Sequence, residues 1–479
     1  MGRRRNRHLP PFETEITHLG PKGQGVGATP TGQVVLVRGA VPGSRIRVRP
    51  SGKRKGVWSG RIEARIRPSA DAVTPQCEVF GLCGGCTLQT LSVEAQRRHK
   101  AAWVSAEVAQ GWERDGLPES VSVHPLRAAP VAYGYRNKLE LSFGSSRYLS
   151  EADHAAGLPI DGRFLGMHAP GRFDRVVDTE RCHLGDEGMG ELLRIVREHA
   201  LVDDAPPCWN AREHVGFWRH LMLRMGANTG QRLVVLFTAD PTPWPDADAR
   251  IEALAEALLA APLSDGSSVT GVHWCVNTGV ADVARGALRR QWGASGLQEV
   301  LSGVRFELAP DAFFQTHTAA AEVLITTISE ALGPVSGTLL DLYCGTGSIG
   351  LCLAGQAQRL IGIEEVESAV HNARENARLN GVEAEFRAAK VEDALDWVGG
   401  GADVHIVVDP PRAGLHPKVA RKLAETDARV LVYVACHPRS LGRDAALLGP
   451  GWRMTDLWSV DLFPQTGHTE AVARFERVP

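Results

Sequence analysis

The feature that most constrains the fold is a repeated alternation of short apolar runs with helical lengths, beginning at Phe313. The apolar runs are GTLLDLY, RLIGIE, AEFRAA, VHIVVDPP and RVLVYVAC, followed by a final pair, DLWSVDLF and EAVARFERV. Such alternation is typical of a parallel, doubly wound α/β sheet, because consecutive parallel strands need a crossover helix. We therefore expect a Rossmann-like α/β domain over residues 310–479.

The N-terminal part of the chain has a different pattern and a strong positive charge. Residues 1–67 contain 15 Lys and Arg against 3 Asp and Glu, a net charge of +12, although the whole chain carries only −2. Short alternating strands (VVLVRG, SRIRVRP, GVWSGRIEARI) separated by Gly and Pro predict a small β-barrel over 12–67, preceded by a basic tail over 1–11. This charge indicates a phosphate-backbone binder, the alternative being a solvated basic segment.

The stretch between these two parts mixes strand-like runs (YRNKLELSF, QRLVVLFT, GVHWCVN) with an Ala/Leu-rich helix, ARIEALAEALLAA. It predicts a central α+β domain over 68–309, in which a helix at about 89–113 packs on the C-terminal domain. The basic start has no following apolar segment, and no apolar run is long enough to span a membrane. The nine cysteines do not suggest a disulfide framework. We therefore expect a cytoplasmic protein.

DLYCGTGSIG, at 341–350, follows an apolar run and precedes a helix, where a glycine turn lets backbone approach a ligand closely. Glu364 ends the next predicted strand, where a carboxylate can bind ribose hydroxyls. The turn also completes GxGxxG, so alone it fits a dinucleotide equally well. The flanking DLYC and the later DPPR favour S-adenosylmethionine.

DPPR, at 409–412, ends the fourth strand at the edge where open α/β sheets bind ligands. Methyltransferases that act on amino groups typically carry an aromatic residue after this proline pair, and here the residue is Arg412. A different activation, thiolate addition to C6 of a pyrimidine, requires a cysteine at a strand end. Cys436 ends LVYVAC, and the carboxylate that would accept the C5 proton is Glu470, in FPQTGHTEAV.

Three further cysteines, Cys77, Cys83 and Cys86, form C-x5-C-x2-C within CEVFGLCGGC, where glycines let the loop fold around an inorganic core. A fourth ligand must come from elsewhere in the chain. The spacing alone fits zinc and an iron–sulfur cluster about equally.

Taken in order, DLYCGTGSIG, DPPRAGL, YVACHPRSL and DLFPQTGHTEAV resemble the RNA uracil-5-methyltransferase family, and ITHLGPKGQGVG with GQVVLVRGAVPGSRIRVRP resembles its TRAM domain, an RNA-binding barrel. The resemblance covers nearly the whole chain. It implies Cys436 as nucleophile and Glu470 as proton acceptor. It also implies cofactor contacts from Gln315, Tyr343, Ser348, Glu364 and Asp409, and a [4Fe–4S] cluster on Cys77, Cys83, Cys86 and Cys182, with zinc the less favoured alternative.

Two positions depart from the family: His437 follows the nucleophile where Asn is common, and Lys390 replaces an Asn often found after the third strand.

The expected substrate is RNA, with 23S rRNA preferred because rRNA enzymes of the family share the barrel and cysteine motif. Further candidate RNA contacts are Tyr135, Arg136, Asn137 and Lys138. The alternatives are a tRNA uracil-5-methyltransferase and an inactive RNA-binding factor in ribosome assembly. A cytosine-5 enzyme shares the thiolate chemistry, but the motifs do not resemble it.

Overall fold

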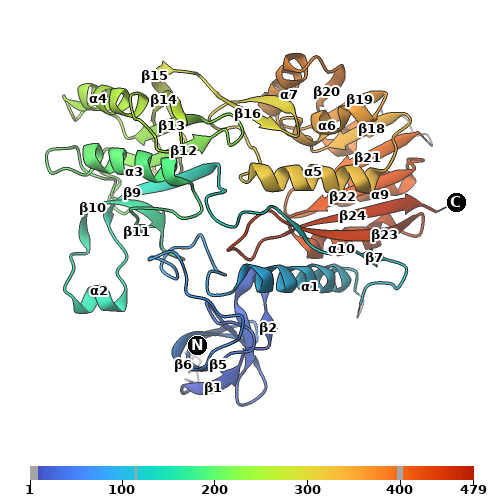
Figure 1. The fold of residues 1–479 in the computed structure, drawn as a ribbon, viewed down its shortest axis with the longest axis horizontal. Helices are drawn as coiled ribbons and strands as arrows, with labels where there is room; N and C mark the ends of the chain where they lie inside the picture. The colour runs from blue at the N-terminus through green and yellow to red at the C-terminus, as the bar shows by residue number, and fades with distance from the viewer. Residues whose placement is uncertain (1–8, 114–115, 396–402, 479) are drawn as a thin grey trace, which may run out of the picture.

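The computed structural model describes residues 9–113, 116–395 and 403–478 and arranges them in three lobes. Figure 1 shows a small β lobe at the bottom, a central lobe on the left and a C-terminal lobe on the right. Helix α1 lies between the small lobe and the C-terminal lobe.

The N-terminal lobe is a six-stranded sheet that curls on itself. Strands β1 and β2 lie at opposite edges of the order β1-β5-β6-β4-β3-β2, yet only Ile16 and Thr17 separate them in the chain. The two edges must therefore approach each other, and Thr17 N donates to Val26 O of β3 at 2.9 Å. The elements are β1 Phe12–Glu15, β2 His18–Leu19, η1 Pro21–Gly23, β3 Gly25–Ala28, β4 Val34–Val37, β5 Arg45–Arg54 and β6 Val57–Arg67.

The central lobe is a seven-stranded mixed sheet in the order β11-β10-β9-β12-β13-β14-β15, with helices α3 and α4 packed on one face. A separate hairpin, β16 and β17, leads to the C-terminal lobe. The elements are β9 Lys138–Ser146, α2 Glu151–Ala155, β10 Asp161–His168, β11 Val176–Asp178, α3 Glu187–Ala200, β12 Trp218–Met225, β13 Gln231–Thr238, α4 Ala247–Leu259, β14 Ser268–Val276, β15 Ala287–Gly293, β16 Leu297–Leu301 and β17 Val304–Leu308.

The C-terminal lobe is built on the expected doubly wound sheet. Strands β20-β19-β18-β21-β22 are parallel, and the last strand, β24, inserts antiparallel between β22 and β23. Its elements are α5 Thr318–Leu332, β18 Thr338–Leu342, α6 Ser348–Leu353, η2 Ala354–Gln356, β19 Arg359–Glu364, α7 Glu367–Leu379, β20 Ala384–Ala388, α8 Val391–Ala394, β21 Val404–Val408, α9 Pro417–Glu425, β22 Val430–Ala435, α10 Pro438–Leu448, β23 Trp452–Asp461 and β24 Glu470–Arg477. The prediction of a Rossmann-like sheet is confirmed.

Segments from the middle of the chain complete this C-terminal lobe. Helix α1, Val93–Gly111, packs against α10, and the short strands β7, Ser122–Val123, and β8, Arg127–Ala128, pair with β23. Helices α5, α6 and α7 share one apolar cluster with the sheet, and α1, α8, α9 and α10 share another. Both faces of the sheet are therefore covered by helices.

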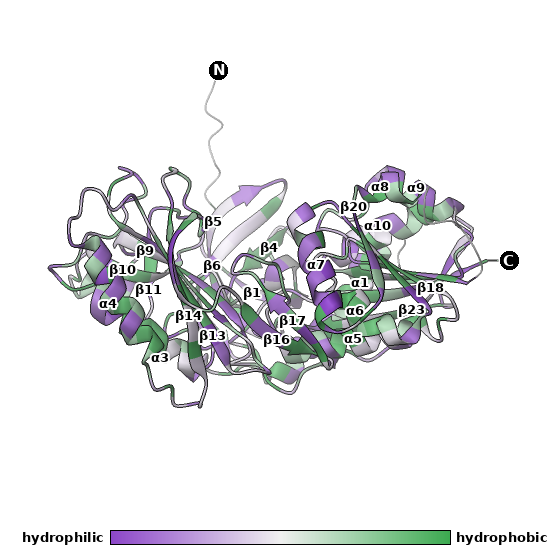
Figure 2. Ribbon diagram, turned by 90° about the horizontal axis from the view of Figure 1, so that it is seen from above, coloured by the Kyte–Doolittle hydropathy of each residue, from purple (hydrophilic) through white to green (hydrophobic). Residues whose placement is uncertain are grey.

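Hydropathy follows this layering. Figure 2 shows α7 largely hydrophilic, as expected of a helix on the outside, and α5 with hydrophobic residues where it meets the sheet. In the described part of the chain, no helix is long and apolar enough to cross a membrane.

Candidate functional site

The glycine turn after β18 has the backbone shape that the sequence predicts. Gly345 and Gly347 have φ values of 53° and 80°, a left-handed region that glycine enters at little cost. Tyr343 has φ 62°, which is uncommon for a residue with a side chain and marks a constrained position. The N–H of Gly350, in α6, donates to Oδ2 of the buried Asp341 at 2.8 Å. The turn is therefore fixed between the end of a strand and the start of a helix.

A cavity opens beside this turn, and four of the five predicted cofactor residues line it: Gln315, Tyr343, Ser348 and Asp409. The other lining residues are mostly apolar and come from β16, α5, the 313–315 segment and the turn itself: Leu301, Phe313, Ala321, Leu324, Ile325, Cys344, Gly345, Thr346 and Ile349. An apolar wall with a few polar groups is the usual composition of a small-molecule site.

Glu364, the fifth predicted cofactor residue, lies beneath the turn and is not among the residues that line the cavity. Its Oε2 accepts from the Gly345 N–H at 3.1 Å and its Oε1 from the Val366 N–H at 2.9 Å. In this arrangement the carboxylate supports the glycine turn.

Cys436 and Glu470 meet at the carboxyl edge of the sheet. The antiparallel register of β22 and β24 pairs Ala435 with Ala471, so the next position sets Cys436 opposite Glu470. Glu470 is only 4% exposed, and its Oε2 has no hydrogen-bond partner among the described residues. Cys436 is half-buried. The sheet therefore brings the predicted nucleophile and the predicted base together.

Three acidic groups share this edge and affect one another. Burial, then the charges of Glu470 and Asp409, raise the pKa of the Cys436 thiol to about 11, and Arg412 opposes this rise. Burial and Asp409 raise the pKa of Glu470 to about 8. Burial raises the pKa of Asp409 to about 7, although part of its surface faces the cavity. The edge is therefore suited to a ligand that brings positive charge.

The two positions that depart from the family lie close to this edge. His437 is the N-terminal flanking residue of α10, its carbonyl accepts from the Ser440 N–H at 2.9 Å, and burial lowers the pKa of its imidazole. Lys390 is the N-terminal flanking residue of α8 and lies two residues after the end of β20.

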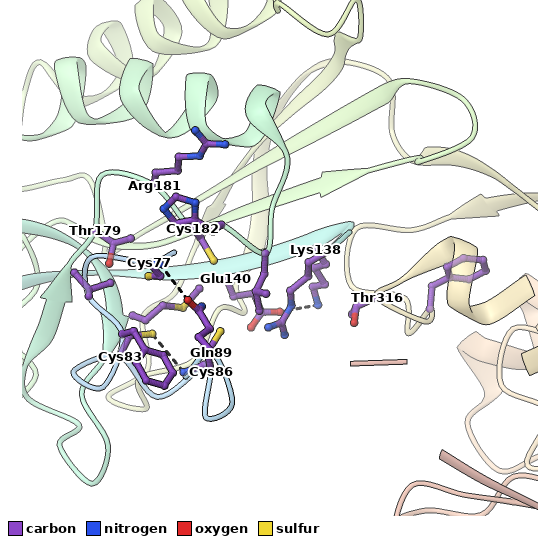
Figure 3. A pocket seen from close by; sticks show the side chains of 18 of the residues that line it. Cys77, Cys83, Cys86, Gln89, Lys138, Glu140, Thr179, Arg181, Cys182 and Thr316 are labelled. Atoms are coloured by element: carbon purple, nitrogen blue, oxygen red, sulfur yellow. Dashed lines mark hydrogen bonds and ion pairs between the residues drawn. The ribbon is translucent and has the colours of Figure 1, made fainter. Parts of the chain in front are cut away.

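The four predicted metal-ligating cysteines gather around a second cavity, of about 430 Å³. Figure 3 shows Cys182, from the loop before α3, facing the loops that carry Cys77, Cys83 and Cys86. Arg38, next to β4 of the barrel, donates to the carbonyls of Cys83, at 2.8 Å, and Cys86, at 3.3 Å. Burial raises the pKa values of Cys77, to about 11, and Cys86, to about 12, so as free thiols both stay protonated at neutral pH.

Within residues 9–113, 116–395 and 403–478, no three His, Cys, Asp or Glu side chains converge tightly enough to hold a single metal ion. The side chain of Phe313, 75% exposed, lines both this cavity and the cofactor cavity, so one segment of chain separates the two sites.

The fold, the glycine turn and the cavity beside it define a class I methyltransferase that uses S-adenosylmethionine. Family models match residues 305–433, as a methyltransferase small domain, and 402–478, as tRNA (uracil-5-)-methyltransferase. An RNA methyltransferase of Chlorobaculum tepidum is 38% identical over 97% of this chain and 96% of its own length. Another, of Caldanaerobacter subterraneus, is 34% identical over 97% and 98%.

Among solved structures, the Pyrococcus abyssi tRNA (uracil-54, C5)-methyltransferase in complex with S-adenosyl-L-homocysteine is similar with a TM-score of 0.73 and 27% identity. The match covers 97% of this chain and 99% of that one. The chain belongs to the RNA uracil-5-methyltransferase family.

Some residues that build the site were not singled out from the sequence. Asp341 is the second-last residue of β18, a strand predicted correctly, and its position before the glycine turn is the available signal. The α5 residues Ala321, Leu324 and Ile325 follow helical spacing, which marks a buried face but not its ligand. Gln96 and Lys100 of α1 contact the loop before Glu470, and nothing local in the sequence indicates those contacts.

Proposed function

We propose that this protein methylates C5 of a uridine in RNA, with Cys436 as nucleophile and Glu470 as general base. The observation that carries the proposal is the β22–β24 register, whose last pair, Ala435 with Ala471, directly precedes Cys436 and follows Glu470, next to a cavity that Asp409 lines. A thiol and a carboxylate at the same end of two paired strands match the two demands of C5 chemistry, addition at C6 and proton removal at C5.

S-adenosylmethionine supplies the methyl group and a positively charged sulfonium. The Cys436 thiolate adds to C6, so that C5 becomes enolate-like and takes the methyl group. Glu470 then removes the C5 proton, the C5–C6 double bond re-forms, and the C6–S bond breaks to release the thiolate. Arg412 favours the thiolate, since its charge lowers the pKa of Cys436. A bound sulfonium would act in the same direction.

We propose two roles for Glu364: it supports the glycine turn, and it binds the cofactor as the sequence predicts. Both of its oxygens accept backbone N–H groups of the turn, so its first role is to hold the turn in shape. A carboxylate oxygen has more than one lone pair, so a ribose hydroxyl can still donate to it.

For the substrate we propose RNA with 23S rRNA first and tRNA second. The basic barrel fits either. The likeness to a tRNA enzyme over 99% of that enzyme's chain keeps tRNA as the second candidate, because the three-lobed arrangement does not distinguish the two substrates.

The test is methylation of unmodified 23S rRNA and tRNA transcripts by the purified protein, read as mapped 5-methyluridine by nucleoside mass spectrometry. We expect Cys436→Ala to abolish the product, and Cys208→Ala, a buried thiol of the central lobe, to leave it unchanged. Full methylation by Cys436→Ala would refute the chemistry. RNA binding without product from the wild-type protein would favour an inactive assembly factor.

We further propose that Cys77, Cys83, Cys86 and Cys182 hold a [4Fe–4S] cluster. A tetrahedral zinc site would bring its thiolate sulfurs to about 3.8 Å from one another, since each Zn–S bond is about 2.3 Å. In a cubane each cysteine binds a different iron, so the four sulfurs stay farther apart around a larger core. All four cysteines line one cavity of about 430 Å³, which has room for such a core and is the observation that supports the proposal.

In this role the cluster would tie the 77–86 loop to the segment before α3 and stabilise the central lobe. Protein purified without oxygen should be brown and contain iron and sulfide, and Cys182→Ser should lower both. Cys352→Ser, in α6, is the matched control. A colourless protein with one equivalent of zinc would overturn this assignment.

A further inference from the structure

The loop between β23 and β24, residues 462–469, leads directly into Glu470 and has a constrained backbone. Gln465 has φ 68°, in the left-handed region, although it carries a side chain. Such a conformation is strained and persists only where surrounding contacts over-determine it. The contacts that hold this loop therefore also determine where Glu470 lies.

Helix α1 supplies the first set of contacts. Gln96 and Gln465 form a reciprocal amide pair: Gln96 Nε2 donates to Gln465 Oε1 at 2.9 Å, and Gln465 N–H donates to Gln96 Oε1 at 3.0 Å. One turn further, Lys100 Nζ donates to Asp461 Oδ1 at 2.6 Å and to the Phe463 carbonyl at 3.0 Å. Gln96, Lys100, Asp461 and Gln465 are all at most 3% exposed, so these bonds do not compete with water.

Two further segments hold the same loop. The carbonyl of Gln465 accepts from the N–H groups of Thr87 and Leu88, at 2.9 and 3.0 Å, in the segment between the cysteine loop and α1. The Tyr135 hydroxyl donates to the Pro464 carbonyl at 2.9 Å. The imidazole of His317 lies 3.0 Å from the Leu462 carbonyl.

The N-terminal barrel packs its backbone directly against the backbone of this loop. A Cβ added at Gly467 would lie 2.5 Å from the backbone carbon of Lys22 and 2.6 Å from the nitrogen of Gly23. The φ of Gly467 is outside the left-handed region, so glycine is required here for space alone. Lys22 has φ 62°, so a constrained turn of the barrel packs on the constrained loop of the site.

We propose that the barrel is a positioning element for the general base: its 22–23 turn and helix α1 together hold the loop that places Glu470 against the substrate. The barrel then contributes to turnover as well as to RNA affinity. This inference rests on the proposed function, since it assigns a support to the proposed base.

The step that should respond is the removal of the C5 proton. In that step the C5–H bond breaks, the proton passes to the Glu470 carboxylate, the electron pair forms the C5–C6 double bond, and the C6–S bond breaks. Thiolate addition and methyl transfer precede it. A displaced Glu470 would therefore cause the methylated, covalently linked enzyme–RNA adduct to accumulate.

The test uses Gly467→Ala in the full-length protein. Its new methyl group meets backbone, so the barrel and the loop must separate. Gly52→Ala, in β5 of the barrel, is the matched control, because a Cβ there meets nothing within 4 Å and its φ is not positive. We expect Gly467→Ala to lower kcat about 10- to 100-fold, with KM for RNA and S-adenosylhomocysteine binding unchanged. The adduct should appear as a slow band on a denaturing gel.

Gln465→Gly is a second variant with the same readout that removes the side-chain bond of the amide pair and keeps the backbone one, while relaxing the left-handed backbone, so the fold is retained. A raised KM with wild-type kcat, or a slower enzyme without adduct, in both variants would overturn the positioning role. If the wild-type protein and Gly52→Ala produce no 5-methyluridine, the proposed function fails instead, so the two failures are distinguishable.

Discussion

At the scale of single residues, three carboxyl groups with raised pKa values lie near the carboxyl edge of the sheet. Burial raises the pKa values of Asp341 and Asp409 to about 7 and that of Glu470 to about 8. One oxygen of Asp341 and one of Glu470 have no hydrogen-bond partner among the described residues. Buried acids with unpaired oxygens suit a site whose ligand supplies positive charge. We infer that the sulfonium of the cofactor completes the electrostatics of this edge.

The first prediction concerns the pH dependence of the rate. A base must be ionised to accept a proton, and the pKa of Glu470 is raised to about 8. The conversion of preformed methylated adduct to product, a step that follows thiolate addition, should therefore speed up with pH and level off above about 8. Glu470→Gln should be slower by about 10²- to 10⁴-fold and lose this dependence. Rapid-quench measurements between pH 6 and 9.5 test both expectations, and a pH-independent wild-type rate would contradict them.

The second prediction concerns stability without cofactor. The pKa of Glu470 in the folded state is above its ordinary value, so the folded protein binds this proton more tightly than the unfolded chain does. Its contribution to stability is therefore fully present below about pH 4.5 and is lost as pH rises to about 8. Thermal melting should show a smaller loss across this range for Glu470→Gln than for the wild-type protein. Parallel curves for the two proteins would refute the raised pKa.

At the scale of elements, helix α1 connects the core of the C-terminal lobe with the loop before Glu470. It packs against α10 through two glycines, where a Cβ at Gly442 would lie 2.0 Å from the Val108 carbonyl and one at Gly111 would lie 2.1 Å from the Arg439 carbonyl. This close approach aligns α1 so that Gln96 and Lys100 reach the loop before Glu470. The helix thus packs on the core and also holds the loop that leads to the site.

The third prediction tests this packing. Gly442→Ala should separate the two helices and lower the free energy of unfolding by about 1–3 kcal/mol, because its methyl group meets backbone that cannot yield without shifting a helix. Gly355→Ala, in η2, has nothing within 4 Å and serves as control. Urea titration measures both. Equal stability of Gly442→Ala and wild type would show that the helices tolerate wider spacing.

The sequence predicted those parts of the site that are local in the chain. Gly345 and Gly347, Asp409 and Cys436 each follow a strand, and parallel strands bring such positions to one edge. Glu364 is predicted as a ribose ligand from its place at the end of β19, whereas its carboxylate in the structure accepts from the backbone N–H groups of Gly345, in the turn, and Val366. The pairing of Gln96 with Gln465, and the fit of Gly467 against the barrel, join segments hundreds of residues apart and have no periodic signal.

At the scale of the whole molecule, the barrel presents a surface that carries a cost in charge repulsion. The register of β5 and β6 sets Arg49 opposite Arg61 and Arg45 opposite Arg67. Like charges across a ladder are destabilising. Ion pairs offset part of this repulsion, since Glu13 pairs with Arg45, Glu15 with Arg67, and Glu63 with Arg47 and Arg49. A polyanion would relieve it, which supports RNA as the partner of this face.

The fourth prediction measures how strongly this face binds phosphate. Replacing the exposed Arg54 and Arg61 with Gln should weaken RNA binding, and the plot of log affinity against log salt should become shallower by about 0.7–0.9 for each phosphate that the variant no longer neutralises. Arg289→Gln and Arg290→Gln, in β15 of the central lobe, form the control pair, and both of these arginines form ion pairs with acids of α4. An unchanged slope in the barrel variant would remove this face from the RNA interface.

The place of β24 has a consequence for how the protein is made. This strand follows β23 in the chain but lies between β22 and β23 in the sheet. A nascent chain that has left the ribosome only as far as β23 therefore exposes two unpaired strand edges and lacks Glu470, so it is open to aggregation and chaperones. When β24 inserts between β22 and β23, it completes the sheet and brings Glu470 to the site at the same time. A growing polypeptide without β24 therefore has no complete active site.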